Sequence, residues 1–338
     1  MKLKIENSPS FILTTFLVFL FGIFIGVRDE SVGSDTASYA KYFYIITESE
    51  QSRISEPLFF LLAKIVSLIS YNPTYFFILI SIISFSTLLL FYSDCAKLGG
   101  DRNKNFHFVF FACTFLLTIF SPFFINTQIN VLRSGLSIPF LFFAGFHFYC
   151  KSYYKFITYS IIALGLHFSS ILYIFSIILF LKFKPKSLFL IFLSGSAIYS
   201  LGVIEPIVLN FVTAFDFEFL NYYLRFFIMD AGYEKGVRFD FLFFTIFFGS
   251  IAFMSHLKFK TDLTKFLVLM YLASSIPFLA IGFMSYSDRL LLPPWFLIPL
   301  IVSNYISCFF NLGFRGFYFI LALAPLFILI SFFVNGLI

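Results

Sequence analysis

The side chains that could carry out chemistry in this chain stand in short polar segments between long apolar stretches. Asp35 and Glu56 are carboxylates that could accept a proton or bind a hydroxyl, and His167 is an imidazole in an apolar neighbourhood. A base must lie within about 3 Å of the hydroxyl that it deprotonates. Arg133 opens a long apolar stretch, and its planar guanidinium could bind two oxygens of one phosphate. These four residues are the candidate catalytic set, and a substrate that carries phosphate would suit the arginine.

A second set of arginines and tyrosines stands in the same kind of segment and could bind the phosphates of that substrate. Lysine would serve there as a general solubilising charge, whereas arginine offers a rigid fork that fits phosphate oxygens. The alternative is that each arginine pairs with one of the acids nearby. The candidate substrate-binding residues are Arg28, Tyr39, Tyr222, Arg225, Arg238 and Arg289.

Three of the catalytic candidates also have a purely structural interpretation. Glu56 precedes Pro57, so it could cap the positive end of a helix that starts there. Arg133 lies near the end of an apolar stretch, so its side chain could extend to the membrane surface. A lone histidine such as His167 is often a hydrogen-bonded packing residue, although it could also act as a base.

Two local patterns place polar residues on a common helix face. Asp35 and Tyr39 are one turn apart if Asp35 begins a helix. Further along, Glu218, Tyr222 and Arg225 fall on one stripe of an otherwise apolar segment. That segment is either an interfacial helix with its polar face in water or a lid over the site.

The composition is that of a membrane protein. The chain has 338 residues, of which 60% are hydrophobic and 12% are charged, against about 25% charged residues in a typical soluble domain. The mean hydropathy is +0.96. A soluble enzyme, a nucleic-acid-binding protein and a disordered chain are excluded, because each must expose many more polar residues to water. The net charge of +6 arises in short loops, where membrane topology explains it, so no nucleic-acid partner is expected.

The apolar stretches predict an all-α polytopic integral membrane protein, a single transmembrane domain over residues 1–338. We expect about 10–12 transmembrane or re-entrant helices together with external amphipathic helices. The clearest spans are 9–27, 73–93, 106–124, 131–150, 187–204, 239–257, 263–284, 290–308 and 317–335. Lysine clusters between them mark the cytoplasmic side and place the N-terminus inside. Most acids and arginines then fall on the external side, where 28–72 and 205–238 form the long loops.

Two segments do not fit as simple spans. Residues 57–70 are too short and carry Lys64, so they predict an external amphipathic helix at the interface. Residues 156–181 have basic clusters at both ends, which predicts two short helices, 156–166 and 168–181, meeting near Gly165 and His167. The two helices form either a re-entrant hairpin or two crossings of the membrane where it is locally thinned, and in both cases His167 lies at the apex.

The sequence gives no sign of a metal or a cofactor. It contains neither a Walker A motif nor HExxH, and Asp216-Phe-Glu218 is only a weak match to a metal-binding acidic pair. The four cysteines lie in or beside apolar stretches without CxxC spacing, which indicates structural thiols. No long apolar helix carries a charge at its midpoint, which argues against an ion-coupled transporter.

Several of these residues also occur in an order that resembles a known family. The segments are Gly33, Asp35 and Tyr39; Glu56-Pro57; Asn130, Arg133, Gly135 and Leu136; His167 with Phe168-Ser169-Ser170; and Asp288-Arg289. Together they resemble the EpsG-like branch of Wzy-type O-antigen and exopolysaccharide polymerases over roughly residues 20–300. Asn130, Ser134 and Leu136 depart from the more polar version that many members carry.

This resemblance implies polymerisation of a glycan at the outer face of the bacterial plasma membrane. The substrate would be an undecaprenyl-pyrophosphate-linked oligosaccharide, with membrane lipid and a chain-length regulator protein as further expected partners and no cofactor. A bundle of the GT-C glycosyltransferase kind is one form that the fold could take. The alternatives are an O-antigen ligase, which needs a similar arginine-rich external site, and a lipid-linked oligosaccharide flippase.

Overall fold

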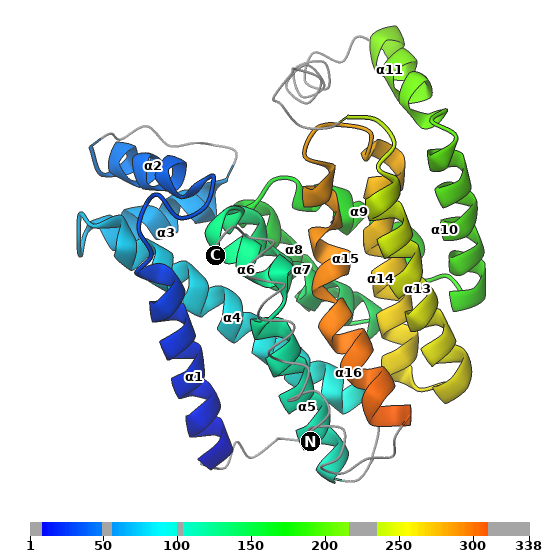
Figure 1. Ribbon diagram of the computed structural model, residues 1–338, viewed down its shortest axis with the longest axis horizontal. Helices are drawn as coiled ribbons and strands as arrows, with labels where there is room; N and C mark the ends of the chain where they lie inside the picture. Colours follow the sequence, from blue (N-terminus) through cyan, green and yellow to red (C-terminus); the bar gives the residue numbers. More distant parts are fainter. Residues whose placement is uncertain (1–8, 49–55, 100–103, 216–234, 310–338) are drawn as a thin grey trace.

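The computed structural model describes residues 9–48, 56–99, 104–215 and 235–309 (Figure 1). These residues form helices and turns and no strand, so the all-α membrane class predicted from the sequence is confirmed. Four of the described helices are long and apolar enough to cross a membrane, and six spans result if each of two bent pairs counts as one. The predicted span 317–335 lies outside the described residues.

Each predicted segment within the described ranges corresponds to a helix or a helix pair. In chain order the helices are α1 (Pro9–Gly26), α2 (Thr36–Glu48), α3 (Pro57–Ser67), α4 (Pro73–Leu98), α5 (Lys104–Ile119), α6 (Pro122–Ile129), α7 (Leu132–Tyr149), α8 (Tyr153–Leu166), α9 (Ser170–Phe180), α10 (Pro185–Ser200), α11 (Ile204–Phe215), α13 (Phe239–Phe259), α14 (Asp262–Ile281), η1 (Ser287–Leu291), α15 (Leu292–Phe296) and α16 (Ile298–Phe309).

One predicted span is broken, which is a correction to the sequence interpretation. The span 106–124 bends by 54° between α5 and α6. The predicted span 187–204 ends where α10 turns by 87° into α11, and 290–308 corresponds to the candidate span Ser287–Cys308, which consists of η1, α15 and α16. Proline explains the break between α5 and α6, because Pro122 lacks the N–H that a continuing helix needs but fits the first turn of a new one. Pro293 and Pro294 likewise occupy the first turns of α15.

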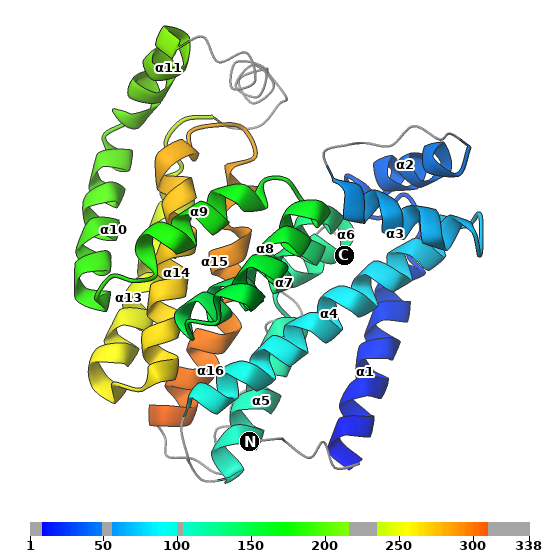
Figure 2. The same ribbon diagram turned by 180° about the vertical axis from the view of Figure 1, so that it is seen from behind.

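Short helices occur where the sequence predicted them. α3 has 11 residues, and it buries the side chains of Phe59, Ala63 and Val66. α8 and α9 have 14 and 11 residues and meet at His167, whose extended backbone (φ −155°, ψ 116°) ends α8. At about 1.5 Å per residue neither helix covers a hydrocarbon core of about 30 Å. Figure 2 shows α8 and α9 beside α7, to which Ser170 is joined by a hydrogen bond with Ser137 of 2.5 Å.

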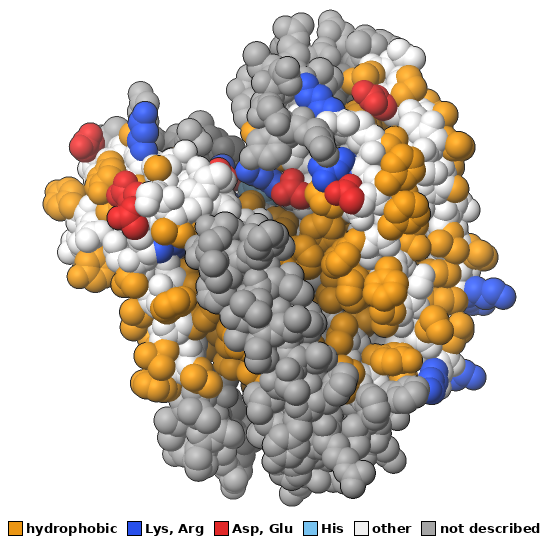
Figure 3. Space-filling model, in the orientation of Figure 1, with side chains coloured by type: hydrophobic (Ala, Val, Ile, Leu, Met, Phe, Trp, Pro, Cys, Tyr) orange, Lys and Arg blue, Asp and Glu red, His pale blue; other side chains and the backbone are white. Residues whose placement is uncertain are grey.

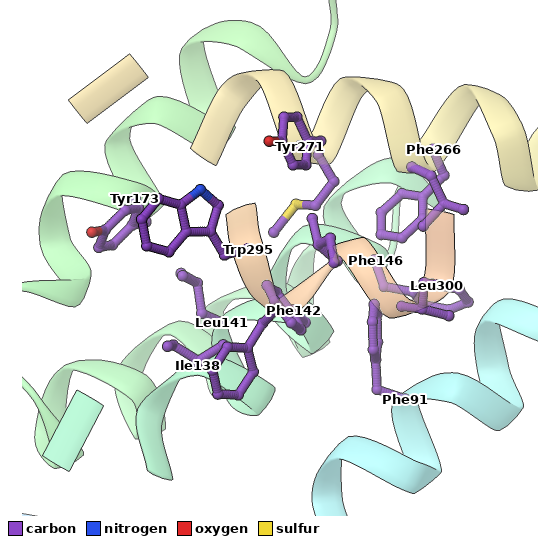
Figure 4. Packing of buried hydrophobic residues seen from close by; sticks show 14 of the residues in the cluster. Phe91, Ile138, Leu141, Phe142, Phe146, Tyr173, Phe266, Tyr271, Trp295 and Leu300 are labelled. Carbon is purple, nitrogen blue, oxygen red and sulfur yellow. The ribbon is translucent and has the colours of Figure 1, made fainter. Parts of the chain in front are cut away.

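The core lies between α7, α14 and the helices around them. Figure 4 shows aromatic and aliphatic side chains of these elements in mutual contact, among them Phe142, Phe266, Tyr271 and Trp295. The outer surface of the bundle is also apolar, with exposed side chains such as Phe24 of α1 at 69%. Figure 3 shows these side chains as a belt across the molecule, with charged groups beyond it. A belt of this kind is what lipid contact requires.

The charged loops separate into two ends of the bundle. At the end that we call the lysine end, Lys182 lies 5.2 Å from the ring centre of Phe148 and Lys265 lies 6.0 Å from that of Tyr149. Tyr149 also donates a hydrogen bond to the carbonyl of Asp262 (3.5 Å), so the ends of α7 and α9 and the start of α14 meet there. The opposite end, which we call the arginine end, holds the described arginines.

Candidate active site

Glu56 is the centre of a three-residue cluster at the arginine end. Its Oε2 accepts a hydrogen bond from Arg133 Nη1 at 2.5 Å, and its Oε1 lies 2.8 Å from His167 Nδ1. The Glu56 side chain is 6% exposed, whereas Arg133 keeps 34% and His167 keeps 24% of their side-chain surface. The buried Glu56 carboxylate therefore binds both Arg133 and His167, and each of these two side chains keeps part of its surface exposed.

Three helix ends bring this cluster together. Pro57 starts α3 and leaves Glu56 at the position before the helix, Arg133 lies in the first turn of α7, and His167 ends α8. Gly165 allows α8 to approach α3, because a Cβ there would stand 2.7 Å from Cγ of Leu58. The Glu56 carboxylate makes no cap bond to α3. Glu56 thus occupies the capping position of α3, as one interpretation of the sequence predicted. Its carboxylate oxygens, however, bind Arg133 of α7 and His167 at the end of α8.

The electrostatics of the cluster favour an ionised Glu56. Burial raises the pKa of this carboxyl, but the hydrogen bond with His167 and the charge of Arg133 lower it by more, so the net pKa lies below the usual value. A neutral His167 then donates from Nδ1 to Glu56 and carries its lone pair on Nε2. Nε2 has no hydrogen-bond partner among the described residues. The arrangement can therefore take a proton from a hydroxyl placed next to Nε2.

A second pair of contacts is positioned by α2. Asp35 precedes this helix, and the amide of Tyr39 donates to its carbonyl (3.0 Å), so the two residues stand one turn apart as predicted. Arg289 Nη2 donates to Asp35 Oδ2 at 3.1 Å, and the Arg133 guanidinium lies 5.9 Å from the Tyr39 ring centre. One helix face thus contacts both an arginine of α7 and an arginine of η1.

Two other predicted binding arginines contact groups outside the Glu56 cluster. Arg28 donates to Thr36 Oγ1 (3.2 Å) and to the carbonyls of Ile25 (3.1 Å) and Ile129 (3.4 Å), and it lies 4.4 Å from the ring centre of Phe77. It joins the ends of α1 and α6 to the start of α2. Arg238 forms two hydrogen bonds with Asp240 (3.0 and 2.6 Å) at the start of α13.

The remaining predicted residues lie outside this description. Tyr222 and Arg225 fall in the segment 216–234, outside the described residues, and so do Asp216 and Glu218. Within the described ranges no group of three or more His, Cys, Asp or Glu side chains stands close enough to hold a metal ion.

Sequence reasoning missed a cleft next to the cluster. It has a volume of about 620 Å³ and is lined by polar and aromatic side chains of α6, α13, η1 and α15, and by Gly33 and Ser34. Figure 3 shows the upper face hollowed there, with acidic and basic side chains at the hollow. The sequence signal was the pair Asn126 and Asn130, one turn apart after Pro122, but the span 106–124 was read as continuous.

The comparison with family models agrees with this assembly of helices and polar residues. The model of the EpsG family matches residues 11–337. The chain belongs to the EpsG family. Comparisons with curated proteins and with solved structures found no match. Membership of the EpsG family indicates a membrane protein of polysaccharide biosynthesis with a polymerase-like activity.

Proposed function

We propose that this EpsG-family protein is a glycosyltransferase that polymerises a surface polysaccharide, such as O-antigen, in the bacterial plasma membrane. It transfers a glycan from undecaprenyl pyrophosphate onto the next lipid-linked repeat unit at the external face. The observation that carries this proposal is the Glu56 carboxylate held between Arg133 and His167. It combines a base and a phosphate-binding fork in one site.

His167 takes the role of general base in this reaction. The acceptor hydroxyl gives its proton to Nε2, its oxygen forms the new bond to C1 of the donor sugar, and the bond from C1 to the pyrophosphate oxygen breaks. The electron pair of that bond goes to the pyrophosphate. Glu56 accepts from Nδ1, which fixes the tautomer and stabilises the imidazolium that forms. Among Asp35, Glu56 and His167, the geometry thus supports His167 as the base and Glu56 as its positioning residue.

Arg133 and Arg289 are placed to stabilise the departing pyrophosphate. In each residue one nitrogen binds a carboxylate, at Glu56 and Asp35 respectively, and the side chains are 34% and 37% exposed. The rest of each fork can bind phosphate oxygens as negative charge develops on them. Preorganised donors of this kind contribute about 2.7–4 kcal/mol each to transition-state stabilisation. No strong acid is needed, because pyrophosphate leaves as an anion.

The test is a gel of surface glycan from a strain that lacks the gene and is complemented with variants. Wild type restores a ladder, whereas Arg133→Ala yields core plus a single repeat unit at an unchanged protein level. Lys97→Ala, a change at the lysine end, serves as the control that keeps the ladder. A normal ladder with Arg133→Ala contradicts the proposal. Accumulation of long external lipid-linked chains indicates a ligase, and accumulation of single units inside indicates a flippase.

A further inference from the structure

The cleft beside the catalytic cluster has the dimensions of a ligand site and no assigned role. Its volume of about 620 Å³ lies within the range of about 300–1,000 Å³ that small-molecule sites occupy. It opens at the arginine end and is bounded by α6 on one side and by the start of α13 and η1 on the other. Its lining does not include Glu56, Arg133 or His167.

The polar part of the lining consists of hydroxyl, amide and carboxylate groups, and it includes Ser34, Asn126, Asn130, Asp240 and Asp288. Asn130 Nδ2 donates to Asn126 Oδ1 at 2.7 Å, which orients the Asn126 amide. The Asn126 amide nitrogen then has no acceptor among the described residues and remains a donor for a ligand. Amides and carboxylates bind hydroxyl groups directly, because each hydroxyl is both donor and acceptor.

The apolar part of the lining is aromatic. Trp295 lies 4.5 Å from Phe123 between ring centres and contacts Phe241 and Phe244 edge-on at 5.4 and 5.3 Å. These rings form a rigid wall, and Phe123, Phe241 and Phe244 keep part of their surface exposed. A pyranose ring has an apolar C–H face and a polar rim, so it matches a cleft that joins aromatic rings to amide and carboxylate groups.

The charge of the lining limits which sugar fits. Asp240 and Asp288 contribute two carboxylates, while the described residues of the lining include neither lysine nor arginine. Arg238 offsets Asp240 through its two hydrogen bonds. Asp288 is partly buried, and the charges of Arg289 and Arg238, which are not among the lining residues, offset part of its own. A sugar carboxylate entering the cleft would therefore be repelled, whereas a neutral or cationic sugar would not.

The cleft and the catalytic cluster share one wall. Ser34 lines the cleft and donates from Oγ to Asp35 Oδ1 at 3.1 Å, and Asp35 holds Arg289. One turn later on α2, Tyr39 lies against Arg133. A glycan with one end at His167 can thus extend past the Asp35–Arg289 pair into the cleft.

We propose that this cleft is the glycan subsite of the enzyme and that it selects a neutral or cationic sugar of the repeat unit over an anionic one. The inference rests on the proposed function, whose catalytic cluster defines where the reacting end of that glycan lies. Asn126 and Asp288 recognise the hydroxyl groups, and Phe123 with Phe241 packs against the ring.

Trp295 provides the measurement, because it is the one tryptophan in the chain and it lines the cleft. The full-length protein in lipid nanodiscs is titrated with glycan released by mild acid from the lipid-linked repeat units of the producing strain. Chitotriose serves as a neutral comparator and trigalacturonic acid as an anionic one. Trp295→Phe removes the emission signal and identifies its source.

We expect a saturable change in Trp295 emission with the released glycan, and a Kd at least tenfold weaker in Asn126→Leu. Lys97→Ala keeps the affinity, since Lys97 pairs with Asp94 at the lysine end and does not line the cleft. Trigalacturonic acid binds more weakly than chitotriose in the wild type, and Asp288→Asn reduces that difference because it removes the negative charge and keeps the shape. The thermal unfolding of each variant is measured alongside, so that only folded protein is compared.

The proposal is overturned if no glycan changes the emission, if Asn126→Leu binds as tightly as wild type, or if the anionic and neutral sugars bind equally. The titration involves no turnover, so it is independent of the ladder test. Loss of the ladder in Arg133→Ala without sugar binding at Trp295 leaves the polymerase proposal intact and removes the cleft. Sugar binding at Trp295 together with a normal ladder in Arg133→Ala supports the cleft as a glycan site and contradicts the polymerase proposal.

Discussion

At the scale of single residues, the two carboxylates of the site differ from His167 in what their atoms already bind. Both oxygens of Glu56 are engaged, and those of Asp35 accept from Ser34 and Arg289. The Nε2 atom of His167 is the basic atom that stays unengaged among the described residues. A carboxylate oxygen that accepts one hydrogen bond still has a second lone pair, so exposure is what separates Glu56 from His167. The Glu56 carboxylate is buried between its two partners, whereas His167 is partly exposed.

This distinction gives different expectations for two variants. His167→Gln removes the base, so the rate of glycosyl transfer should fall by about 10²–10⁴-fold. Glu56→Gln keeps the imidazole but not its orientation, so the rate should fall by less, with a shift in the pH at which transfer is half-maximal. Initial rates of purified variants on lipid-linked repeat units measure both. A greater loss in Glu56→Gln than in His167→Gln would instead make Glu56 the base.

The lowered pKa of Glu56 also predicts how stability depends on pH. A carboxyl whose folded pKa lies below its usual 4.5 stabilises the fold above that pH, and the contribution is lost as the pH falls through the lowered value. At pH 7, Glu56→Gln should therefore lower the free energy of unfolding by roughly 1–3 kcal/mol. The variant should accordingly unfold at a lower temperature than wild type.

The gap between the two melting temperatures should stay constant down to about pH 5 and narrow below it. Glu48→Gln, at an exposed position at the end of α2, is the matched control and should unfold like wild type throughout. A gap that widens on acidification would contradict the assigned ion pairs.

At the scale of secondary structure, apolar length and proline positions predicted most helices, including the short pair that meets at His167. The bend between α5 and α6 was missed, because a hydropathy pattern continues through a change of helix direction. The pairing of Glu56 with residues 77 and 111 positions away was beyond the sequence as well. Such contacts depend on how helix ends pack, and local spacing does not encode them.

Close packing of α7 on α6 is a testable part of this arrangement. A Cβ on Gly135 would stand 2.8 Å from the backbone oxygen of Thr127, which cannot move aside as a side chain can. Gly135→Ala should therefore destabilise the protein by about 1–3 kcal/mol and reduce polymer formation by displacing Arg133. In Gly195→Ala the nearest contact is Cδ1 of Leu279 at 3.2 Å, so this control should behave like wild type. Equal thermal stability of the two variants would refute the packing argument.

At the scale of the whole molecule, an apolar belt separates two charged ends (Figure 3). Lysines contact aromatic rings at one end, and arginines pair with acids at the other. Lysine-rich loops remain on the cytoplasmic side because translocating them is unfavourable. Arginines at the other end are held by carboxylates or backbone carbonyls, as Arg289 and Arg28 are. We therefore expect the catalytic cluster to face the outside of the cell, where a lipid-linked donor presents its pyrophosphate.

The native cysteines make this orientation measurable. Cys150 is exposed at the lysine end, whereas Cys95 and Cys113 are buried. A membrane-impermeant maleimide should leave Cys150 unmodified in intact cells and modify it after permeabilisation. A second cysteine, introduced as Ser31→Cys at an exposed position of the arginine end, should react in intact cells. Since both thiols are in one chain, each serves as the control for the other. Modification of Cys150 alone in intact cells would show that the topology is inverted and that the catalytic cluster faces the cytoplasm. That orientation is incompatible with a polymerase that acts on exported lipid-linked units.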